Sequence, residues 1–294
     1  MFLKWMVEAA RGKMKTYFDC IPCFLRQALE AARALDLDEE KTAALLRRTL
    51  GLAQQLDWST PPPVIGRDIH RAIREVSGDP DPYLKRKIAD TEAALKLLPE
   101  VDRAIAKSAD PFATAVKFSI AGNAIDLGAK TAVEADVEKT FHEALTRPLD
   151  EAAVQALEKA ISGAKDVLFL ADNAGEIVFD RPLLEQIGAK VTVAVRGAPT
   201  INDATLDDAK RSGLTERFDV ISNGADTPGT WLPDCSPEFV QKFNSADLVI
   251  AKGQGNYESL NDHPRKIFFL FLTKCPVVSS DLGIPTNTYV IREI

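Results

Sequence analysis

One stretch of this chain runs from a buried strand directly into a polar turn. Residues 167–170 are four bulky apolar residues in a row, too few for a helix and typical of a strand buried on both faces. Residues 172–176, Asp-Asn-Ala-Gly-Glu, follow closely, and apolar residues then recur at helical spacing up to Gly188. Open parallel sheets bind ligands where the carboxyl end of a strand turns into a helix. The stretch therefore predicts a parallel sheet with a ligand site at its edge.

The rest of the C-terminal half repeats this alternation of strand and helix. It is the pattern of a parallel sheet wrapped by helices. Strands are predicted at 167–170, 191–195, 220–221 and 248–250. Three further apolar runs would complete the sheet or its edge, at 267–272, 277–278 and 289–291.

The first 160 residues or so show helical patterns and no predicted strand. Helices are expected at 22–35, 38–56, 65–76, 83–105, from 111, at 137–144 and at 151–161. We interpret the triple proline at 61–63 as a linker or a stiff corner. The chain is thus predicted to be an α/β protein, with an all-helical region at 14–162 and an α/β domain at 163–294. Met14 could be the true translation start.

Charge and apolar content narrow the class of protein. The net charge of -7 argues against nucleic acid or an anionic membrane surface as the main partner. No apolar run approaches the ~20 residues that span a bilayer, and the N-terminus lacks the apolar region of a signal peptide. Four cysteines are too few for a secreted disulfide scaffold. We therefore expect a cytoplasmic protein, and the oligomeric state stays open.

Polar motifs follow three of the predicted parallel strands, at 172–176, 196–203 and 252–258. Because parallel strands point the same way, these motifs are expected to face one crevice. Asp172, Asn173 and Asp203 offer hard oxygen ligands, which suit Mg²⁺ or Mn²⁺ better than zinc. The sequence therefore predicts a divalent-metal site in the crevice.

Cations and glycines complete a phosphate site around the predicted metal. Lys252 would supply a mobile ammonium group, and Arg196 a second cation. Gly253 and Gly255 let backbone N–H groups approach a ligand closely. A metal ion combined with cations and N–H groups can stabilise a phosphoryl group during its transfer.

Each motif also has a simpler explanation. Asp172 and Asn173 could form a helix-capping turn, and Asp203 could cap the helix that starts near Ala204. Lys252 could be a surface lysine at a strand end. The functional interpretation is favoured, because otherwise all of these simpler explanations would have to hold at the same sheet edge.

Other polar residues near the motifs have less certain roles. Asn123 and Asp126 lie in a glycine-bounded turn, and they either shape that turn or reach the crevice. Glu176 could cap a helix, orient a water or bind a substrate hydroxyl. Asp180 is expected to pair with Arg181 or with the backbone.

Cys20 and Cys23 form the one closely spaced cysteine pair of the sequence. This spacing fits a redox pair or half of a zinc site, but no second CxxC completes a tetrad. We interpret the two residues first as buried structural thiols at a helix start, and second as metal ligands.

Five motifs in order resemble the DUF89 family of metal-dependent damage-control phosphatases, in the subgroup that carries an N-terminal CxxC. The resemblance extends from Met14 to the C-terminus. The motifs are Cys20-Ile-Pro-Cys23 with the following Arg-Gln-Ala-Leu, Ala-Gly-Asn123 to Asp126, Asp172-Asn-Ala-Gly-Glu176, Asn202-Asp203-Ala204 and Lys252-Gly-Gln-Gly-Asn256.

The resemblance implies a helical N-terminal region packed on a Rossmann-like domain, and hydrolysis of small phosphorylated metabolites such as sugar or cofactor phosphates and their damaged forms. It implies that Asp172, Asn173 and Asp203 hold Mg²⁺, Mn²⁺, Co²⁺ or Ni²⁺ and that Lys252 lies near the phosphate. Attack on phosphorus would come from a metal-activated water or from Asp172 itself. Substrate contacts are expected from Asn123, Asp126, Glu176, Arg196, Gly253, Gly255 and Asn256.

Two other functions remain open at this point. The crevice could bind a nucleotide or phosphate without cleaving it, although the first turn has no G-x-G-x-x-G and the chain has no Walker lysine motif. Alternatively, Cys20 and Cys23 could make the protein a metal or redox sensor.

Overall fold

The computed structural model of the chain describes residues 13–122 and 145–294. The expected helix at 137–144, and the candidate residues Asn123 and Asp126, lie outside these described residues. None of the described helices is long and apolar enough to cross a membrane.

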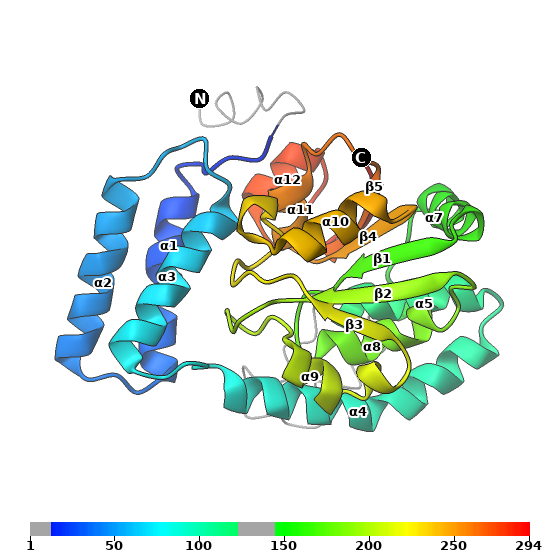
Figure 1. Cartoon of the computed structure of the whole chain (residues 1–294), viewed down its shortest axis with the longest axis horizontal. Helices are drawn as coiled ribbons and strands as arrows, with labels where there is room; N and C mark the ends of the chain where they lie inside the picture. The colour runs from blue at the N-terminus through cyan, green and yellow to red at the C-terminus, as the bar shows by residue number, and fades with distance from the viewer. Residues whose placement is uncertain (1–12, 123–144) are drawn as a thin grey trace.

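A single mostly parallel sheet organises the described part of the chain, as the sequence predicts (Figure 1). Its strand order is β3-β2-β1-β4-β5-β6, in which the last strand is antiparallel to its neighbour and the others are parallel. The order reverses between β1 and β4, which is where ligands bind in sheets of this kind. The strands are β1 (Asp166–Leu170), β2 (Lys190–Val195), β3 (Asp219–Ser222), β4 (Leu248–Lys252), β5 (Ile267–Leu272) and β6 (Tyr289–Glu293).

Helices cover both faces of the sheet, so alternate residues of a strand enter different cores. In β1, Val167 and Phe169 belong to one core, and Leu168 and Leu170 to the other. On the first face lie α4 (Leu84–Lys107), α5 (Pro111–Gly122), α7 (Glu151–Gly163), α8 (Glu176–Leu184) and α9 (Leu206–Arg211). On the second lie α10 (Pro237–Ser245), α11 (Gln254–Leu260) and α12 (Pro276–Leu282) (Figure 1). Two short 3₁₀ helices, η2 (Leu214–Glu216) and η3 (Leu232–Asp234), lie in the connections.

The strand predicted at 277–278 is wrong, because these residues lie in α12. Pro276 occupies the first turn of that helix, and Gly283 ends it with a left-handed φ of 69°. Proline at the start and glycine past the end are helix signals. Two adjacent valines can be buried by a short helix as well as by a strand, so the apolar pair did not distinguish the two.

The first three helices form a separate layer beside the sheet. They are α1 (Cys20–Ala34), α2 (Glu39–Gln54) and α3 (Pro62–Ser77), and they share a core of their own. In Figure 1 this layer stands opposite the carboxyl ends of the strands. The interpretation of 61–63 as a linker is wrong for two of the three prolines, because Pro62 and Pro63 begin α3. Proline is tolerated there since the first N–H groups of a helix have no intrahelical partner.

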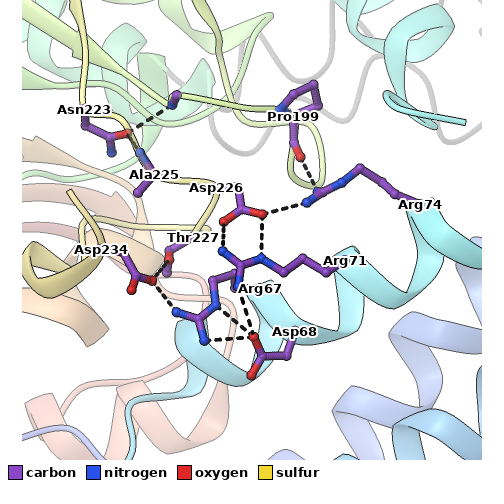
Figure 2. A network of polar contacts seen from close by, with 11 residues as sticks. Arg67, Asp68, Arg71, Arg74, Pro199, Asn223, Ala225, Asp226, Thr227 and Asp234 are labelled. Atoms are coloured by element: carbon purple, nitrogen blue, oxygen red, sulfur yellow. Dashed lines mark hydrogen bonds and ion pairs between the residues drawn. The ribbon is translucent and has the colours of Figure 1, made fainter. Parts of the chain in front are cut away.

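Helix α3 is fixed to the loops of the α/β part by a network of arginines and aspartates (Figure 2). Arg71 makes two hydrogen bonds of 2.8 and 2.6 Å to the carboxylate of Asp226. Arg74 donates to the same carboxylate at 2.6 Å and also to the carbonyl of Pro199. Because Pro199 lies in the loop that follows β2, the network positions this loop relative to the helical layer.

We expect Asp226→Asn to weaken this contact in a pH-dependent way. Burial alone would raise the pKa of Asp226, but the hydrogen bonds and charges of Arg71 and Arg74 lower it below 3.8. A carboxyl with a lowered pKa stabilises the fold above its unfolded pKa and loses this effect as the pH falls through its folded value. The variant should therefore lose about 1.5–3 kcal/mol at pH 7.

Denaturant unfolding at pH 7 and at pH 3 measures this effect. The difference between Asp226→Asn and the wild type should shrink at the lower pH. Glu75→Gln, which removes the exposed partner of Arg48, is the matched control and should change stability by less than about 1 kcal/mol. A loss for Asp226→Asn that is equal at both pH values would contradict the account.

Candidate functional site

The loops after β1 and β2 are paired with each other through their backbones. Asn173 and Asp203 form an isolated antiparallel bridge. The Ala204 N–H donates to the Asp172 carbonyl at 2.7 Å, and the Ala174 N–H donates to the Asn202 carbonyl at 2.9 Å. The structure thus brings the first two polar motifs together at the carboxyl edge of the sheet.

Negative charge is concentrated at this edge. Burial, followed by the nearby carboxylates of Glu176 and Asp203, raises the pKa of Asp172 well above its usual range. Burial also raises the pKa of Asp203, although Arg196 opposes this shift. Arg196 Nε lies 2.6 Å from Asp203 Oδ2, and Arg196 Nη2 lies 3.6 Å from Asp172 Oδ1. The arginine is buried against both aspartates, and the site still disfavours their full ionisation.

The amide of Asn173 is oriented by two carboxylates. Its Nδ2 donates to Asp172 Oδ2 at 3.0 Å and to Glu176 Oε2 at 2.9 Å. An amide nitrogen carries two N–H donors, so these bonds account for both. The oxygen Oδ1 is therefore the atom that Asn173 could offer to a cation.

Lys252 is neither the mobile ammonium group predicted for the phosphate site nor the surface lysine of the simpler explanation. Its side chain is fully buried, and Nζ donates to Glu176 Oε1 at 2.7 Å, to Asp180 Oδ1 at 2.5 Å and to the Ser119 carbonyl at 2.7 Å. Burial would lower the pKa of Lys252, but the carboxylates of Asp180 and Glu176 raise it above its ordinary value. Its described partners are protein groups behind the site.

Asp180 also differs from the expectation, because it pairs with Lys252 and Ser119 rather than with Arg181 or the backbone. Burial, opposed by Lys252, raises the pKa of Asp180 to about 6. A chain of polar contacts thus runs from Asp180 through Lys252 and Glu176 to Asn173. This chain fixes the site from behind.

The turn after β4 lies against the turn after β1. Gly253 has a left-handed φ of 78°, and a Cβ at this position would lie 2.0 Å from Asp172 Oδ2. A Cβ on Gly255 would lie 2.6 Å from the Pro228 carbonyl. Asn256 is buried, accepts from Thr230 Oγ1 at 2.7 Å and donates to the Lys252 carbonyl at 2.6 Å. The described contacts of Asn256 therefore fix the turn after β4 against the rest of the protein.

Replacing Gly253 by alanine should displace the Asp172 carboxylate. We expect the metal-dependent activity that the sequence predicts to fall by about 10–100-fold, the usual effect of disturbing the support of a metal ligand. Gly213→Ala is the matched control, because Gly213 has a similar φ of 74° but no atom within 4 Å of the added Cβ. Both variants should lose about 1–3 kcal/mol of stability from the strained backbone, which calorimetry measures. Equal activity in the two variants would show that the contact with Asp172 is unimportant.

The helical layer closes a cavity of about 810 Å³ over the sheet edge. Asp172, Asn173 and Asp203 line one wall. Residues from the first turns of α1 and α3, including Cys23 and Pro62, line another. A smaller cavity of about 270 Å³ adjoins it, sharing Asn173 and Lys274 with the larger one.

Lys274 is a cation of this site that the sequence did not single out. It follows β5, lines both cavities, and interacts through its charge with the carboxylates of Glu176 and Asp172. Burial lowers the pKa of Lys274, and the two carboxylates oppose this shift. Its position in the sequence was the available signal. Lys274 comes two residues after the strand predicted at 267–272, and the three polar motifs also begin one or two residues after predicted strands.

A family model and two named relatives place this chain in the same protein family. The family model for the damage-control phosphatase ARMT1-like domain matches residues 16–290. The damage-control phosphatase PH1575 of Pyrococcus horikoshii is 34% identical across 94% of this chain and 97% of that protein. A damage-control phosphatase of Archaeoglobus fulgidus is 34% identical across 94% of this chain and 98% of that protein.

Two further similarities cover nearly the whole chain. An uncharacterized protein of Methanocaldococcus jannaschii, MJ0202, is 34% identical across 99% of this chain and 98% of that protein. The crystal structure of a DUF89 family protein of Pyrococcus horikoshii superimposes with a TM-score of 0.87 and 32% identity, covering 95% of this chain and 98% of that one.

Proposed function

The chain belongs to the DUF89 family of damage-control phosphatases, and from this we propose that it is a divalent-metal-dependent phosphatase acting on a small phosphorylated metabolite. One observation carries the proposal: the backbone bridge between Asn173 and Asp203 sets three oxygen-bearing side chains at one sheet edge. The relatives named damage-control phosphatases support phosphatase activity, and the substrates we propose, from the resemblance, are damaged or excess sugar or cofactor phosphates.

The side chains present at the edge fit a hard divalent cation. Asp172, Asn173 and Asp203 offer oxygen atoms, the ligands preferred by Mg²⁺ and Mn²⁺, and Co²⁺ and Ni²⁺ are also compatible with the family. In the described ranges, no three His, Cys, Asp or Glu side chains lie close enough to hold a metal ion. A cation would therefore need the amide oxygen of Asn173 beside the two carboxylates. The pKa of Asp172 is raised by burial and then by the nearby carboxylates, which supports this assignment because a bound cation would offset both effects.

The chain's own residues hold the proposed metal ligands and the metabolite in place. A bound cation would stabilise negative charge on the phosphoryl oxygens. Arg196 holds the two aspartates in place, and Asn173 is held by Glu176, which is fixed by Lys252. The rest of the metabolite would lie in the larger cavity, against the prolines of α1 and α3.

We assign the cation that contacts the phosphate to Lys274 rather than Lys252, because Lys274 lines the cavities. Lys274→Ala should lower kcat/KM for an aryl phosphate by about 10–100-fold, the effect of losing one hydrogen bond to a charged group. Lys274→Arg keeps the charge and should retain more of the activity. Lys190→Ala, exposed at the start of β2, is the control at the opposite edge. Unchanged kcat/KM in Lys274→Ala would contradict the assignment.

Release of inorganic phosphate from a panel of phosphorylated sugars and cofactors, with each of the four metals and with a chelator, tests the proposal. We expect hydrolysis that requires a metal and is lost with the chelator. Tight binding of these compounds without phosphate release would instead favour a non-catalytic phosphate-binding module.

A further inference from the structure

Two cysteines of the N-terminal motif lie in the wall of the larger cavity and have no role in the proposed hydrolysis. Cys20 is the first residue of α1, and Cys23 follows in the same first turn. Both line the cavity that also contains Asp172, Asn173 and Asp203. A dithiol pair therefore faces the same space as the predicted metal site.

The helical spacing of the pair is slightly longer than a disulfide needs. Residues three apart on a helix have Cβ atoms about 5–6 Å apart, and a disulfide needs about 3.5–4.5 Å. A small shift of the first turn of α1 would close this difference. Cys23 Sγ accepts weak hydrogen bonds from Arg26 Nη2 at 3.7 Å and Gln27 Nε2 at 3.8 Å. Arg26 and Gln27 also line the cavity, so closing the disulfide would alter the cavity wall.

The two sulfurs differ in access. Cys20 is buried, with 7% of its surface exposed, and Cys23 is half-buried. Burial raises the pKa of Cys20 to about 12, so its sulfur is mostly a protonated thiol at neutral pH. Cys23 is thus the sulfur that a reagent in the cavity reaches first.

We propose that Cys20 and Cys23 form a thiol–disulfide exchange site for low-molecular-weight disulfides that enter the larger cavity. The Cys23 thiolate attacks one sulfur of the small disulfide, whose S–S bond breaks and releases one thiolate. Cys20, on losing its proton to that thiolate or to solvent, then attacks Cys23 Sγ and displaces the second thiol. The protein dithiol is oxidised by two electrons, and one small disulfide is reduced to two thiols.

Because the two sites share one cavity, we expect the rate of this exchange to depend on phosphate binding. This part of the inference rests on the proposed function. A phosphate and metal ion in the cavity restrict access to Cys23. We therefore expect the exchange to be slower when the cavity is occupied.

Mass spectrometry of the full chain treated with glutathione disulfide tests the site. We expect the loss of two hydrogens per chain and a peptide linked through Cys20 and Cys23, both reversed by a dithiol reductant. Cys20→Ser should stop at a mixed disulfide on Cys23. Cys235→Ser is the matched control, because Cys235 lies outside the cavity lining and its Sγ donates to the Trp231 carbonyl, and it should react like the wild type.

Inorganic phosphate with Mn²⁺ should slow the reaction, because both would occupy the cavity through which a small disulfide reaches Cys23. Cys275 is a third free thiol that lines the same cavity. A disulfide that joins Cys23 to Cys275, or uptake of one zinc ion that Cys20→Ser abolishes without any disulfide forming, would overturn the inference. Because the mass measurement needs no turnover, a disulfide found in a protein without phosphatase activity would support this site and refute only the proposed function.

Discussion

Asp172→Asn should lose nearly all metal-dependent hydrolysis while the fold remains intact. The substitution removes a charged ligand from the proposed metal site, and we expect kcat/KM for an aryl phosphate to fall on the order of 10³-fold. Stability should not fall with it. Because the pKa of Asp172 is raised in the folded protein, its ionisation opposes folding as the pH rises above the ordinary carboxyl value. A neutral amide relieves this opposition at pH 7.

Steady-state kinetics and denaturant unfolding at pH 7 measure the two effects separately. Asp207→Asn is the matched control, because Asp207 lies four residues from Asp203 but is 82% exposed in the first turn of α9, and it should keep full activity. Full activity in Asp172→Asn would refute the metal site. A large loss of stability would refute the electrostatic argument.

Lys252→Met should destabilise the protein strongly. It removes a buried ammonium group and leaves the carboxylates of Glu176 and Asp180 without their shared partner. Breaking a buried ion pair in this way costs about 3–5 kcal/mol. The double variant with Asp180→Asn should recover part of this loss, since one of the two uncompensated charges is then gone.

Thermal or denaturant unfolding of the single and double variants measures the effect. Lys266→Met, which removes an exposed partner of Glu293, should change stability by less than about 1 kcal/mol. Normal stability of Lys252→Met together with lost phosphate affinity would show that Lys252 contacts the phosphate, as the family resemblance implies.

The sheet and the meeting of the first two motifs could be predicted from sequence because both follow from strong local signals. Residues 167–170 are buried on both faces, and such strands appear as uninterrupted apolar runs. Once these strands are parallel, the polar residues after them must share an edge. The bridge between Asn173 and Asp203 is a direct result of that geometry.

The sequence could not show how the charges at that edge are paired. Lys252 precedes a glycine-rich turn, which is equally compatible with contact to a ligand and with burial between Glu176 and Asp180. That choice depends on α5 and α8, whose packing beneath the turn is a tertiary feature. Lys274 was missed for a related reason. Its place two residues after a predicted strand was the one available signal, because Thr-Lys-Cys-Pro resembles no ligand-binding turn, and the cavity lining shows that it reaches the site.

Titration calorimetry with Mn²⁺ on the full chain, comparing the wild type with Asp203→Asn, tests the central claim most directly. The account predicts one Mn²⁺ site per chain in the wild type and affinity at least about 10–100-fold weaker in the variant. Asp207→Asn should bind as the wild type does. Equal Mn²⁺ affinity in the wild type and Asp203→Asn, or no Mn²⁺ binding by the wild type, would contradict the account.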